Sequence, residues 1–386
     1  MPKVLIYRDQ LLPYSETFIP AQGESLLRYQ AIYVGVSRLT ECLDTQKTIL
    51  LGEIPAIASP LRRFWKGIYK LGGVVHPQWV EVLKQQQPTL MHAHFGSDGG
   101  LALPLCQRLE IPLVVTFHGY DATWDTPGWT TIRSQGDLFR ALLLNKRDRA
   151  LTKANRIIAV SKFIRHQLVL RGTAGNRIVV HYIGVDRQLF QPQLDQVREP
   201  IVLFVGRLVE KKGVEYLIRA MESVQRQISK AQLVIIGDGS LRSHLQTLAH
   251  QRSVRVDFLG KQSPDQVRYW MNRAQIFCGP SIIARSGDAE GFGMVFAEAQ
   301  AMGLPVVSFA TGGIPEAVIH GETGLLAPEK DIEQLSKNLI RLLEDAELRE
   351  KFSLAGQAHV ADNFDLQKNT SQLESIYDET VDHYQS

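Results

Sequence analysis

The stretch Glu290-Gly-Phe-Gly-Met-Val-Phe-Ala-Glu298 places a carboxylate at each end of a glycine-containing loop that leads into an apolar segment, 295–302. The glycines at 291 and 293 allow the backbone to approach a ligand, and the first N–H groups of the helix predicted to follow have no intrahelical partner. Such a helix end attracts anions, phosphate above all.

The spacing of the two glutamates is the second informative feature of this stretch. At a rise of about 1.5 Å per residue they lie about 12 Å apart, and a carboxylate can accept hydrogen bonds from two hydroxyls. The stretch therefore fits the sugar and the ribose of a nucleotide sugar. A solvated helix end with acidic residues near its dipole explains the stretch equally well.

Cations follow an apolar strand in another stretch, Val205-Gly-Arg-Leu-Val-Glu-Lys-Lys-Gly213. The strand is predicted over 201–205, and Arg207, Lys211 and Lys212 lie between its end and a helix predicted from about Val214. Cations just past the carboxyl end of a strand, at the mouth of an open α/β sheet, are well placed to bind a diphosphate.

Together these motifs closely resemble glycosyltransferase family 4, whose members are retaining, nucleotide-sugar-dependent enzymes of the GT-B fold. The family pattern is a Gly-Arg-Leu loop with a following Lys, and then a Glu-x7-Glu motif. In this chain it reads Gly206-Arg207-Leu208, Lys212, and Glu290 through Glu298. The resemblance continues through 299–307, 312–316 and 321–325, and so covers essentially the whole C-terminal half.

The resemblance implies a donor site in the C-terminal half. Its catalytic residues there would be Arg207 and Lys212, which would stabilise charge on the leaving diphosphate, and Glu290, which would hold sugar hydroxyls. Glu298 would bind the ribose, and the base would lie near Gly260 and Lys261. The donor-binding positions are Gly206, Gly260, Lys261, Phe292, Gly293, Met294, Val295 and Glu298.

The resemblance also implies a mechanism. Double displacement with retention would need a second carboxylate about 5 Å from the general acid, and nothing in the sequence places one opposite Glu290. The family is thought to use front-face substitution, in which the leaving diphosphate accepts the proton of the acceptor. Its members need no DxD-type metal motif, so we expect metal independence and no cofactor. The nucleotide sugar would be a co-substrate, with UDP the first candidate nucleotide and GDP the second.

Two loops of the N-terminal half carry further candidate residues. His118 follows a strand predicted over 113–117, at the position where the family has a histidine near the donor sugar, and Asp121 is expected on the acceptor side. A histidine bonded only to loop backbone is the alternative for His118. His92 and His94 are two residues apart on a predicted strand, so both face the same side of it. Such a pair could bind a metal ion, but no third ligand follows in the sequence. We therefore expect His94 to line the interdomain cleft on the acceptor side.

The N-terminal half departs from the family after its first strand. Many members have a glycine pair there, whereas this chain has Leu12-Pro-Tyr-Ser-Glu-Thr-Phe18. This form is similar to that of the exopolysaccharide-building members. Ser15, Glu16 and Thr17 are expected on the acceptor side, with the Ser15 and Thr17 hydroxyls in place of backbone contacts. The customary Asn before Gly-Val-Asp is Ile183.

Short apolar runs alternate with helical stretches throughout, which predicts parallel sheets. The expected fold class is α/β: GT-B, with two Rossmann-like, doubly wound parallel-sheet domains facing a cleft. The expected boundaries are 1–190 for the acceptor domain, 191–362 for the nucleotide-sugar domain, and 363–386 for a helix that returns to the first domain, with Leu373 and Tyr377 as apolar anchors. Strands are predicted over 4–7, 31–36, 90–94, 113–117, 156–160, 178–182, 201–205, 232–236, 255–258, 276–279 and 305–308.

Composition agrees with a two-domain enzyme, because 386 residues with 44% apolar content can form two cores. Three widely spaced cysteines without a CxxC motif favour a reducing compartment over a disulfide or zinc framework. No apolar run approaches a membrane span, and the first residues form a strand pattern in place of a signal-peptide core. We therefore expect a cytoplasmic protein.

Charge is unevenly distributed along the chain. Residues 1–190 carry 23 Lys and Arg against 14 Asp and Glu, whereas the remainder carries 20 against 26. The segment 60–71 combines Leu61, Phe64, Trp65, Ile68 and Tyr69 at helical spacing with Arg62, Arg63, Lys66 and Lys70 between them. Such a helix can lie on anionic lipid at the inner face of a membrane, or it can pack against the core with a basic outer face. We expect a glycan or lipid-linked acceptor and no nucleic acid.

Three alternatives remain open on the sequence. One is a GT-B enzyme that epimerises or hydrolyses a nucleotide sugar without an acceptor. Another is a dinucleotide-dependent oxidoreductase, although Gly237-Asp-Gly239 lacks the third glycine of the fingerprint, because residue 242 is Arg. The third is a non-catalytic membrane-bound scaffold, against which the intact charged motifs argue.

Overall fold

The computed structural model spans all 386 residues, and we describe every residue except 14–15, 39–44, 46, 55–58, 125–134 and 194–195. The chain forms two compact units. Unit 1 comprises Met1–Gly184 and Leu366–Ser386, and unit 2 comprises Val185–Asp365. These boundaries lie a few residues from those expected at 190 and 362.

Unit 1 is built on a seven-stranded sheet of order β5-β3-β1-β6-β7-β8-β9, in which every pairing is parallel. Its main strands are β1 (Lys3–Tyr7), β3 (Gln30–Gly35), β5 (Thr48–Leu50), β6 (Leu90–His94), β7 (Leu113–Phe117), β8 (Arg156–Ala159) and β9 (Ile178–Val180). The short strands β2 (Gln10–Leu11) and β4 (Ser37–Arg38) form a separate parallel pair. Its helices are α1 (Phe18–Glu24), η1 (Leu51–Glu53), α2 (Ser59–Gly72), α3 (Pro77–Lys84), α4 (Gly96–Leu109), α5 (Tyr120–Thr123), α6 (Gln135–Lys153), α7 (Lys162–Leu170), η3 (Gly175–Arg177) and α15 (Leu366–Gln385).

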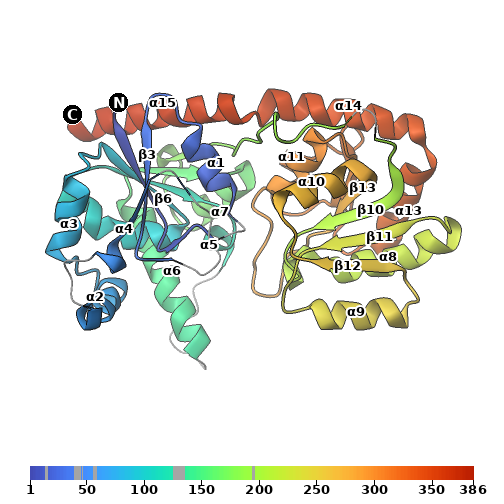
Figure 1. Cartoon of the computed structure of the whole chain (residues 1–386), viewed down its shortest axis with the longest axis horizontal. Coiled ribbons are helices and arrows are strands. Elements are labelled where there is room, and N and C mark those ends of the chain that lie inside the picture. The colour runs from blue at the N-terminus through green and yellow to red at the C-terminus, as the bar shows by residue number, and fades with distance from the viewer. Residues whose placement is uncertain (14–15, 39–44, 46, 55–58, 125–134, 194–195) are drawn as a thin grey trace. The chain divides into compact units, whose positions relative to one another are not determined.

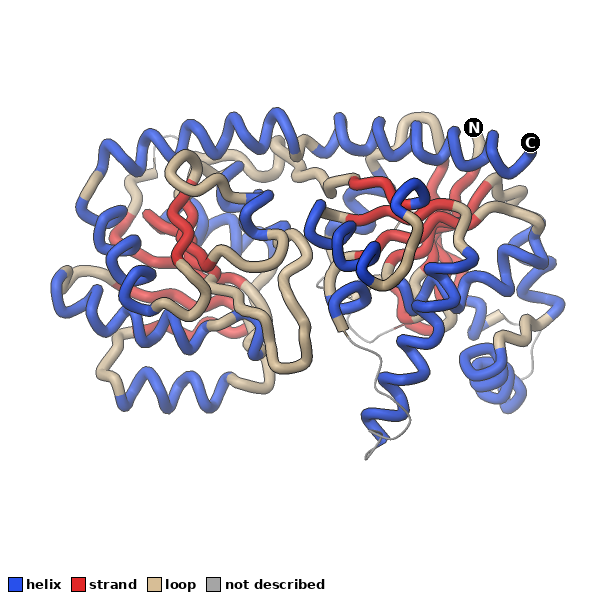
Figure 2. The backbone as a smooth tube through the Cα atoms, turned by 180° about the vertical axis from the view of Figure 1, so that it is seen from behind, coloured by secondary structure: helices blue, strands red, loops and turns tan. Residues whose placement is uncertain are grey.

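Unit 2 has a six-stranded parallel sheet of order β12-β11-β10-β13-β14-β15. Its strands are β10 (Glu199–Val205), β11 (Gln232–Ile236), β12 (Val256–Gly260), β13 (Ala274–Gly279), β14 (Val306–Phe309) and β15 (Gly324–Ala327). Its helices are η4 (Glu210–Lys212), α8 (Val214–Gln227), α9 (Arg242–Gln251), α10 (Pro264–Arg273), α11 (Met294–Ala301), α12 (Ile314–Ala317), α13 (Ile332–Glu344) and α14 (Ala346–Asn363). Figure 1 labels many of the helices and strands of the two units, and Figure 2 shows helices on both faces of the sheet in each unit.

The predicted parallel α/β architecture is confirmed. Most inner strands are largely apolar because both faces of each sheet are covered, and β7, Leu-Val-Val-Thr-Phe, is buried at every position. α8 begins at Val214, as predicted, directly after Gly213, whose φ of 63° suits a residue without a side chain. The sequence analysis did not predict β2, β4, β5 or β15.

The C-terminal helix α15 is part of the core of unit 1. This helix packs its apolar side chains, Leu373, Ile376 and Tyr377, into one core cluster with Val4 of β1 and Tyr33 of β3. The carboxylate of Glu374 accepts hydrogen bonds from the backbone N–H groups of residues 27, 28 and 29, at 2.8, 2.5 and 3.2 Å. The helix therefore completes a unit that begins more than 300 residues earlier in the chain. Among the described residues, we find no helix with the length and apolar character needed to cross a membrane.

Candidate active site

In unit 2 the two sequence motifs meet where the strand order reverses. The chain runs from β10 outward through β11 to β12, and then returns to β13 on the other side of β10. Ligands of open α/β sheets bind outside the carboxyl ends of the strands at such a reversal. Gly206 directly follows β10, and the loop from Glu290 to Gly293 lies between β13 and α11.

Two lysines and two carboxylates form ion pairs at this edge. Lys212 pairs with Glu290, and Lys211 pairs with Asp288 at 3.1 Å. Burial alone would raise the pKa of Glu290, but the positive charges of Lys212, Lys211 and Arg207 outweigh it and lower the pKa to about 2. Glu290 is therefore ionised at any ordinary pH. Arg207 is exposed to solvent.

The loop that carries Glu290 is held by backbone contacts with glycines 312 and 313. Gly313 donates its N–H to the carbonyl of Glu290 at 2.9 Å. A side chain at Gly312 would overlap the Glu290 carbonyl, and one at Gly313 would overlap that of Gly291. The glycine pair in the motif is thus required for close packing of two loops.

Gly293 precedes helix α11 with a φ of 85°, a left-handed conformation that favours glycine. No side chain among the described residues caps this helix. The first N–H groups of α11, from Met294 and Val295 onward, are then left for solvent or a ligand. Phe292 is buried against Phe364, with ring centroids 4.8 Å apart, so it could contribute only its backbone.

Glu298 lies one turn further along α11. Burial raises the pKa of its carboxyl to about 7, and no hydrogen bond to this carboxyl occurs within the described part of the chain. Its environment thus contrasts with that of Glu290, which is paired and strongly acidic. A carboxyl of this kind gains from a ligand that donates hydroxyl hydrogen bonds to it.

Three neighbouring loops pack closely at the ends of β10, β11 and β12. Gly260 ends β12 with a φ of 70°, and its carbonyl accepts the N–H of Gly237 at 2.8 Å. Side chains at Gly237 or Gly239 would overlap the backbone carbonyls of Gly206 and Leu208. These glycines therefore serve loop packing, which explains why they stand without the third glycine of a dinucleotide fingerprint. The predicted residue Lys261 follows on the same edge and is exposed.

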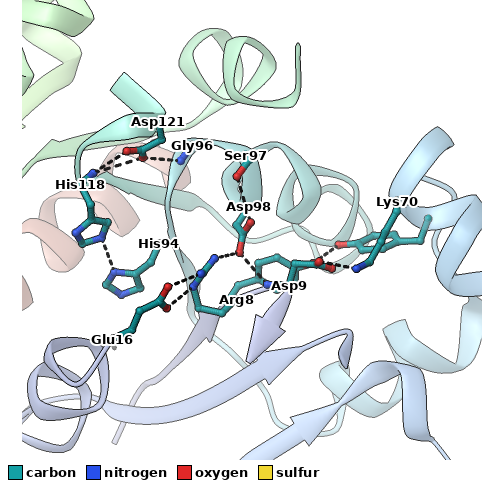
Figure 3. A network of polar contacts seen from close by, with 12 residues as sticks. Arg8, Asp9, Glu16, Lys70, His94, Gly96, Ser97, Asp98, His118 and Asp121 are labelled. Atoms are coloured by element: carbon teal, nitrogen blue, oxygen red, sulfur yellow. Dashed lines mark hydrogen bonds and ion pairs between the residues drawn. The ribbon is translucent and has the colours of Figure 1, made fainter. Parts of the chain in front are cut away.

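In unit 1 the strand order reverses between β1 and β6, and Arg8 occupies this point (Figure 3). Its guanidinium donates to both carboxylate oxygens of Glu16, at 2.8 and 2.6 Å, and also binds Asp98 in the first turn of α4. Asp98 accepts the backbone N–H of Asp9 at 2.8 Å as well, and Lys70 from α2 binds the carboxylate of Asp9 at 2.6 Å.

The acceptor-side residues predicted around position 16 have different environments. Glu16 is buried and held by Arg8, so its carboxylate anchors the loop before α1. Thr17 is exposed and directly precedes α1. Ser15 lies outside the described residues. The role of Ser15, Glu16 and Thr17 in acceptor binding stays a prediction.

His118, His94 and Asp121 come together at the ends of β6 and β7. His94 Nδ1 and His118 Nε2 share a hydrogen bond of 3.1 Å. Asp121, buried, accepts backbone N–H groups of Gly96, His118 and Gly119 at 2.9, 3.1 and 2.8 Å. Its carboxylate therefore fixes the loop that carries His118.

The HxH pair is engaged in hydrogen bonds within the protein. His92 and His94 face the same side of β6, with ring centroids 4.4 Å apart. Both nitrogens of His92 are bonded, Nδ1 to the Tyr377 hydroxyl and Nε2 to that of Thr116, each at 2.7 Å. Within the part of the chain that the structure describes, no group of three or more His, Cys, Asp or Glu is placed to hold a metal ion.

Comparison with known proteins identifies the family. The family model described as glycosyl transferases group 1 matches residues 186–359, and the model described as Glycosyltransferase Family 4 matches residues 46–189. The amylovoran biosynthesis glycosyltransferase AmsK of Erwinia amylovora is 31% identical over 293 residues, which cover 73% of this chain and 68% of AmsK. The chain belongs to glycosyltransferase family 4.

A second relative and a solved structure add to this family 4 assignment. A GDP-mannose-dependent mannosyltransferase of Corynebacterium glutamicum, which acts on a monoacylated phosphatidylinositol monomannoside, is 40% identical over 162 residues, or 42% of each chain. The crystal structure of HepE of Anabaena in complex with UDP and glucose superposes with a TM-score of 0.74 and 19% identity, covering 98% of this chain and 100% of HepE. The fold of this family 4 glycosyltransferase is thus GT-B.

Two sets of site residues were missed by the sequence analysis. Arg8 and Asp98 of this family 4 glycosyltransferase are buried at the reversal point of unit 1. The signal for Arg8 was present, because a charged residue directly follows a buried strand at the edge where α/β sheets bind ligands. Asp288, the partner of Lys211, gave no local signal because the two are 77 residues apart.

Proposed function

We propose that the chain transfers a sugar, with retention of anomeric configuration, from a nucleoside diphosphate sugar to a hydroxyl of a cell-envelope glycan or glycolipid. One observation carries the proposal: Arg207, Lys212 and Glu290 gather at the strand-order reversal of unit 2, close to the uncapped start of α11. The relatives support the acceptor class, because their names refer to amylovoran biosynthesis and to a phosphatidylinositol mannoside.

The charge state of Glu290 bears on the mechanism. A carboxyl with a pKa of about 2, paired with Lys212, cannot serve as a proton donor near neutral pH. We therefore assign it to sugar hydroxyls. In the proposed step the acceptor oxygen bonds to the anomeric carbon on the face that the diphosphate leaves. The carbon–oxygen bond to the β-phosphate breaks, and a phosphate oxygen takes the acceptor proton.

The remaining roles follow from the same arrangement. Arg207 and Lys212 stabilise the charge that develops on the diphosphate. The N–H groups at the start of α11 bind phosphate or sugar oxygens, Glu298 binds the ribose, and the backbone near Gly260 lies beside the base. In unit 1, His118 is the residue that we assign to the reacting sugar. The nucleotide sugar is the co-substrate, and no cofactor or metal is needed.

Thermal unfolding with UDP, GDP, ADP or NAD, in the presence of EDTA, tests this function. A ligand at 100 times its Kd adds about 2.7 kcal/mol to the stability of the unit that binds it, so a clear rise in Tm is expected. We expect the rise with UDP first and GDP second. A rise with NAD alone would contradict a transferase, and a rise that requires a divalent metal would contradict metal independence.

The raised pKa of Glu298 predicts that nucleotide binding depends on pH. Hydroxyl donors favour the carboxylate, so binding must displace the proton that Glu298 holds below its pKa of about 7. The Kd for the nucleotide is then expected to rise as pH falls from 8 to 6, by up to about tenfold per unit below 7. Calorimetric titration of the wild type and of Glu298→Gln measures this. The variant should bind the nucleotide more weakly, and its Kd should lack the part of the pH dependence that comes from the Glu298 proton. An equal dependence of Kd on pH in the two proteins would exclude binding of the ribose by Glu298.

The raised pKa of Glu298 also determines how the stability of the folded protein changes with pH. Because the folded-state pKa of Glu298 lies above its ordinary value of 4.5, ionisation of this group lowers stability as pH rises from about 4.5 to 7. Glu298→Gln should therefore raise Tm at pH 8 and change it little at pH 4.5.

We also propose that α2 places the enzyme on an anionic lipid surface, at the inner face of the cell membrane. Tyr69 is fully buried and bonds to Tyr7 and to the carbonyl of Leu101, which anchors one side of the helix. Its other side exposes Leu61 and Phe64, at 51% and 59%, beside the exposed cation Arg63. Exposed apolar side chains next to cations suit anionic lipid.

Vesicle sedimentation tests this surface. Arg63→Glu/Phe64→Ser should lose most binding to vesicles of phosphatidylglycerol in phosphatidylcholine, because each basic residue near such a surface contributes about 1 kcal/mol. The control is Leu170→Ser on α7, which replaces an apolar side chain that is even more exposed, at 68%, and this variant should bind as the wild type does. Undiminished binding of the α2 variant would exclude this helix as the contact.

A further inference from the structure

Two histidine rings from neighbouring strands lie against each other at the reversal edge of unit 1 (Figure 3). His94 ends β6 and His118 follows β7, and the two strands are paired so that His94 lies opposite Thr116. This register brings His94 Nδ1 within 3.1 Å of His118 Nε2, with the rings stacked at 5.3 Å. His94 is almost completely buried, whereas His118 is partly exposed.

The position of His118 is fixed independently on its other sides. Asp121 accepts its backbone N–H and that of Gly119, as described above. Phe95 and Phe18 lie against the imidazole, with ring centroids 4.6 and 5.0 Å from it. Phe95 adopts a φ of 70°, an unfavourable backbone conformation for a bulky residue, and Arg8 lies 4.4 Å over its ring. The described residues around it thus hold the plane of His118 without using its second ring nitrogen, Nδ1.

The charge state of the pair limits its hydrogen bonding. Burial first, and then the positive charge of Arg8, lower the pKa of His118 well below its usual value. Burial together with His92, His118 and Arg8 does the same for His94. A neutral imidazole has one N–H and one lone pair. The bond between Nε2 of His118 and Nδ1 of His94 therefore couples the two tautomers. If Nε2 of His118 donates, its Nδ1 is an acceptor, and if Nε2 accepts, its Nδ1 is a donor.

His94 is itself supported from the far side. The His92 ring packs 4.4 Å from it, and His92 is held by Tyr377 of α15 and by Thr116 of β7. A partner held in this way can fix the ring orientation of the residue it binds.

We propose that His94 is a positioning residue, whose Nδ1 holds Nε2 of His118 so that a single neutral tautomer of His118 presents Nδ1 to the reacting sugar. This inference rests on the proposed function, in which His118 contacts that sugar. It replaces the expectation that His94 lines the cleft as a direct ligand contact, because nearly the whole side chain is buried. One of the two rings donates and the other accepts, so the pair needs no additional proton.

Three substitutions at position 94 separate positioning from simple packing. The amide atoms of His94→Asn lie one bond beyond Cγ, as Nδ1 of histidine does, and can bond to Nε2 of His118. In His94→Gln the amide lies one bond further, and His94→Phe keeps a ring without a nitrogen. The readout is the pair of ring ¹⁵N chemical shifts of His118 in the full-length protein, assigned by their loss in His118→Asn.

Wild type and His94→Asn should show one protonated and one unprotonated nitrogen for His118. In His94→Gln and His94→Phe the two shifts should move toward a common average as tautomers exchange. Wild-type shifts in His94→Gln would overturn the proposal, as would averaging in the wild type itself or in His94→Asn. The last two outcomes need no Gln or Phe variant, so the test survives if those variants fail to fold.

Thermal shifts with UDP and GDP keep this test distinct from that of the proposed function. Those nucleotides report on unit 2, whereas the histidine shifts report on unit 1. A fixed tautomer without any nucleotide response would support the His94–His118 pairing and contradict the transferase. A nucleotide response with an averaged wild-type tautomer would contradict the pairing alone.

Discussion

Replacing Lys212 by alanine is expected to lower sugar-transfer turnover by about two to three orders of magnitude, the usual loss when one preorganised group that stabilises transition-state charge is removed. Lys212 is paired with Glu290 at the strand-order reversal of unit 2. In the proposed reaction its ammonium group stabilises the departing diphosphate. Arg207→Ala is expected to have an effect of the same order. The measurement is steady-state kinetics with a nucleotide sugar as donor. Its nucleotide is the one that the melting experiment identifies.

Two controls separate this loss from unfolding. Lys230 is an exposed lysine of unit 2 between α8 and β11, and Lys230→Ala should keep wild-type turnover. Melting curves should show that Lys212→Ala is folded, since Lys211 and Arg207 remain near Glu290. Wild-type turnover in Lys212→Ala or in Arg207→Ala would refute the proposed role of the cations.

The second large effect concerns stability. A chain that ends at residue 365 should lose the cooperative unfolding transition of unit 1 and keep that of unit 2, including its response to nucleotide. Burial of a large apolar side chain contributes about 1.5–3 kcal/mol, and α15 supplies Leu373, Ile376 and Tyr377 to the core of unit 1. Their joint loss approaches the whole stability of a typical domain, about 5–15 kcal/mol. Calorimetry of the full and shortened chains measures the two transitions.

A milder variant gives a matched comparison on the same helix. Glu374→Ala leaves three N–H groups at residues 27–29 without their acceptor, at about 1–3 kcal/mol for each group that stays unsatisfied. Asp378 binds Arg28 and accepts a hydrogen bond from the Tyr29 hydroxyl at 2.8 Å, but its side chain is 41% exposed, so water can replace it and Asp378→Ala should cost less than Glu374→Ala. Equal losses in the two variants would show that the buried acceptor has no special role.

The sequence was most informative where a local pattern determines local structure. The strand at 201–205, the helix from Val214 and the common face of His92 and His94 all follow from residue patterns of short range, and the structure has all three. The two motifs proposed to bind the donor were equally visible, because Glu290 through Glu298 and the Gly-Arg-Leu loop each lie within one segment.

The contacts that the sequence could not predict depend on the register of distant segments. The bond from His94 to His118 requires the β6–β7 pairing, and the pair Arg8–Asp98 requires β1 next to β6. β15 has only four residues and no flanking pattern that distinguishes it from a loop. On α2, Tyr69 is buried in the core whereas Phe64 is exposed to solvent. Both residues belong to the same helical spacing of apolar positions, so the sequence pattern does not distinguish them.

The return of α15 to unit 1 means that unit 2 is an uninterrupted insertion within unit 1. On the ribosome, the first 184 residues emerge early but lack the helix that completes their core. At about 5–20 residues per second, the nascent chain waits on the order of 10–40 s before that helix is made. During this interval unit 2 can finish folding, whereas the apolar surface of β1 and β3 that Tyr377 will cover stays open. Chaperone binding to the nascent chain should therefore be strongest on the half that is synthesised first.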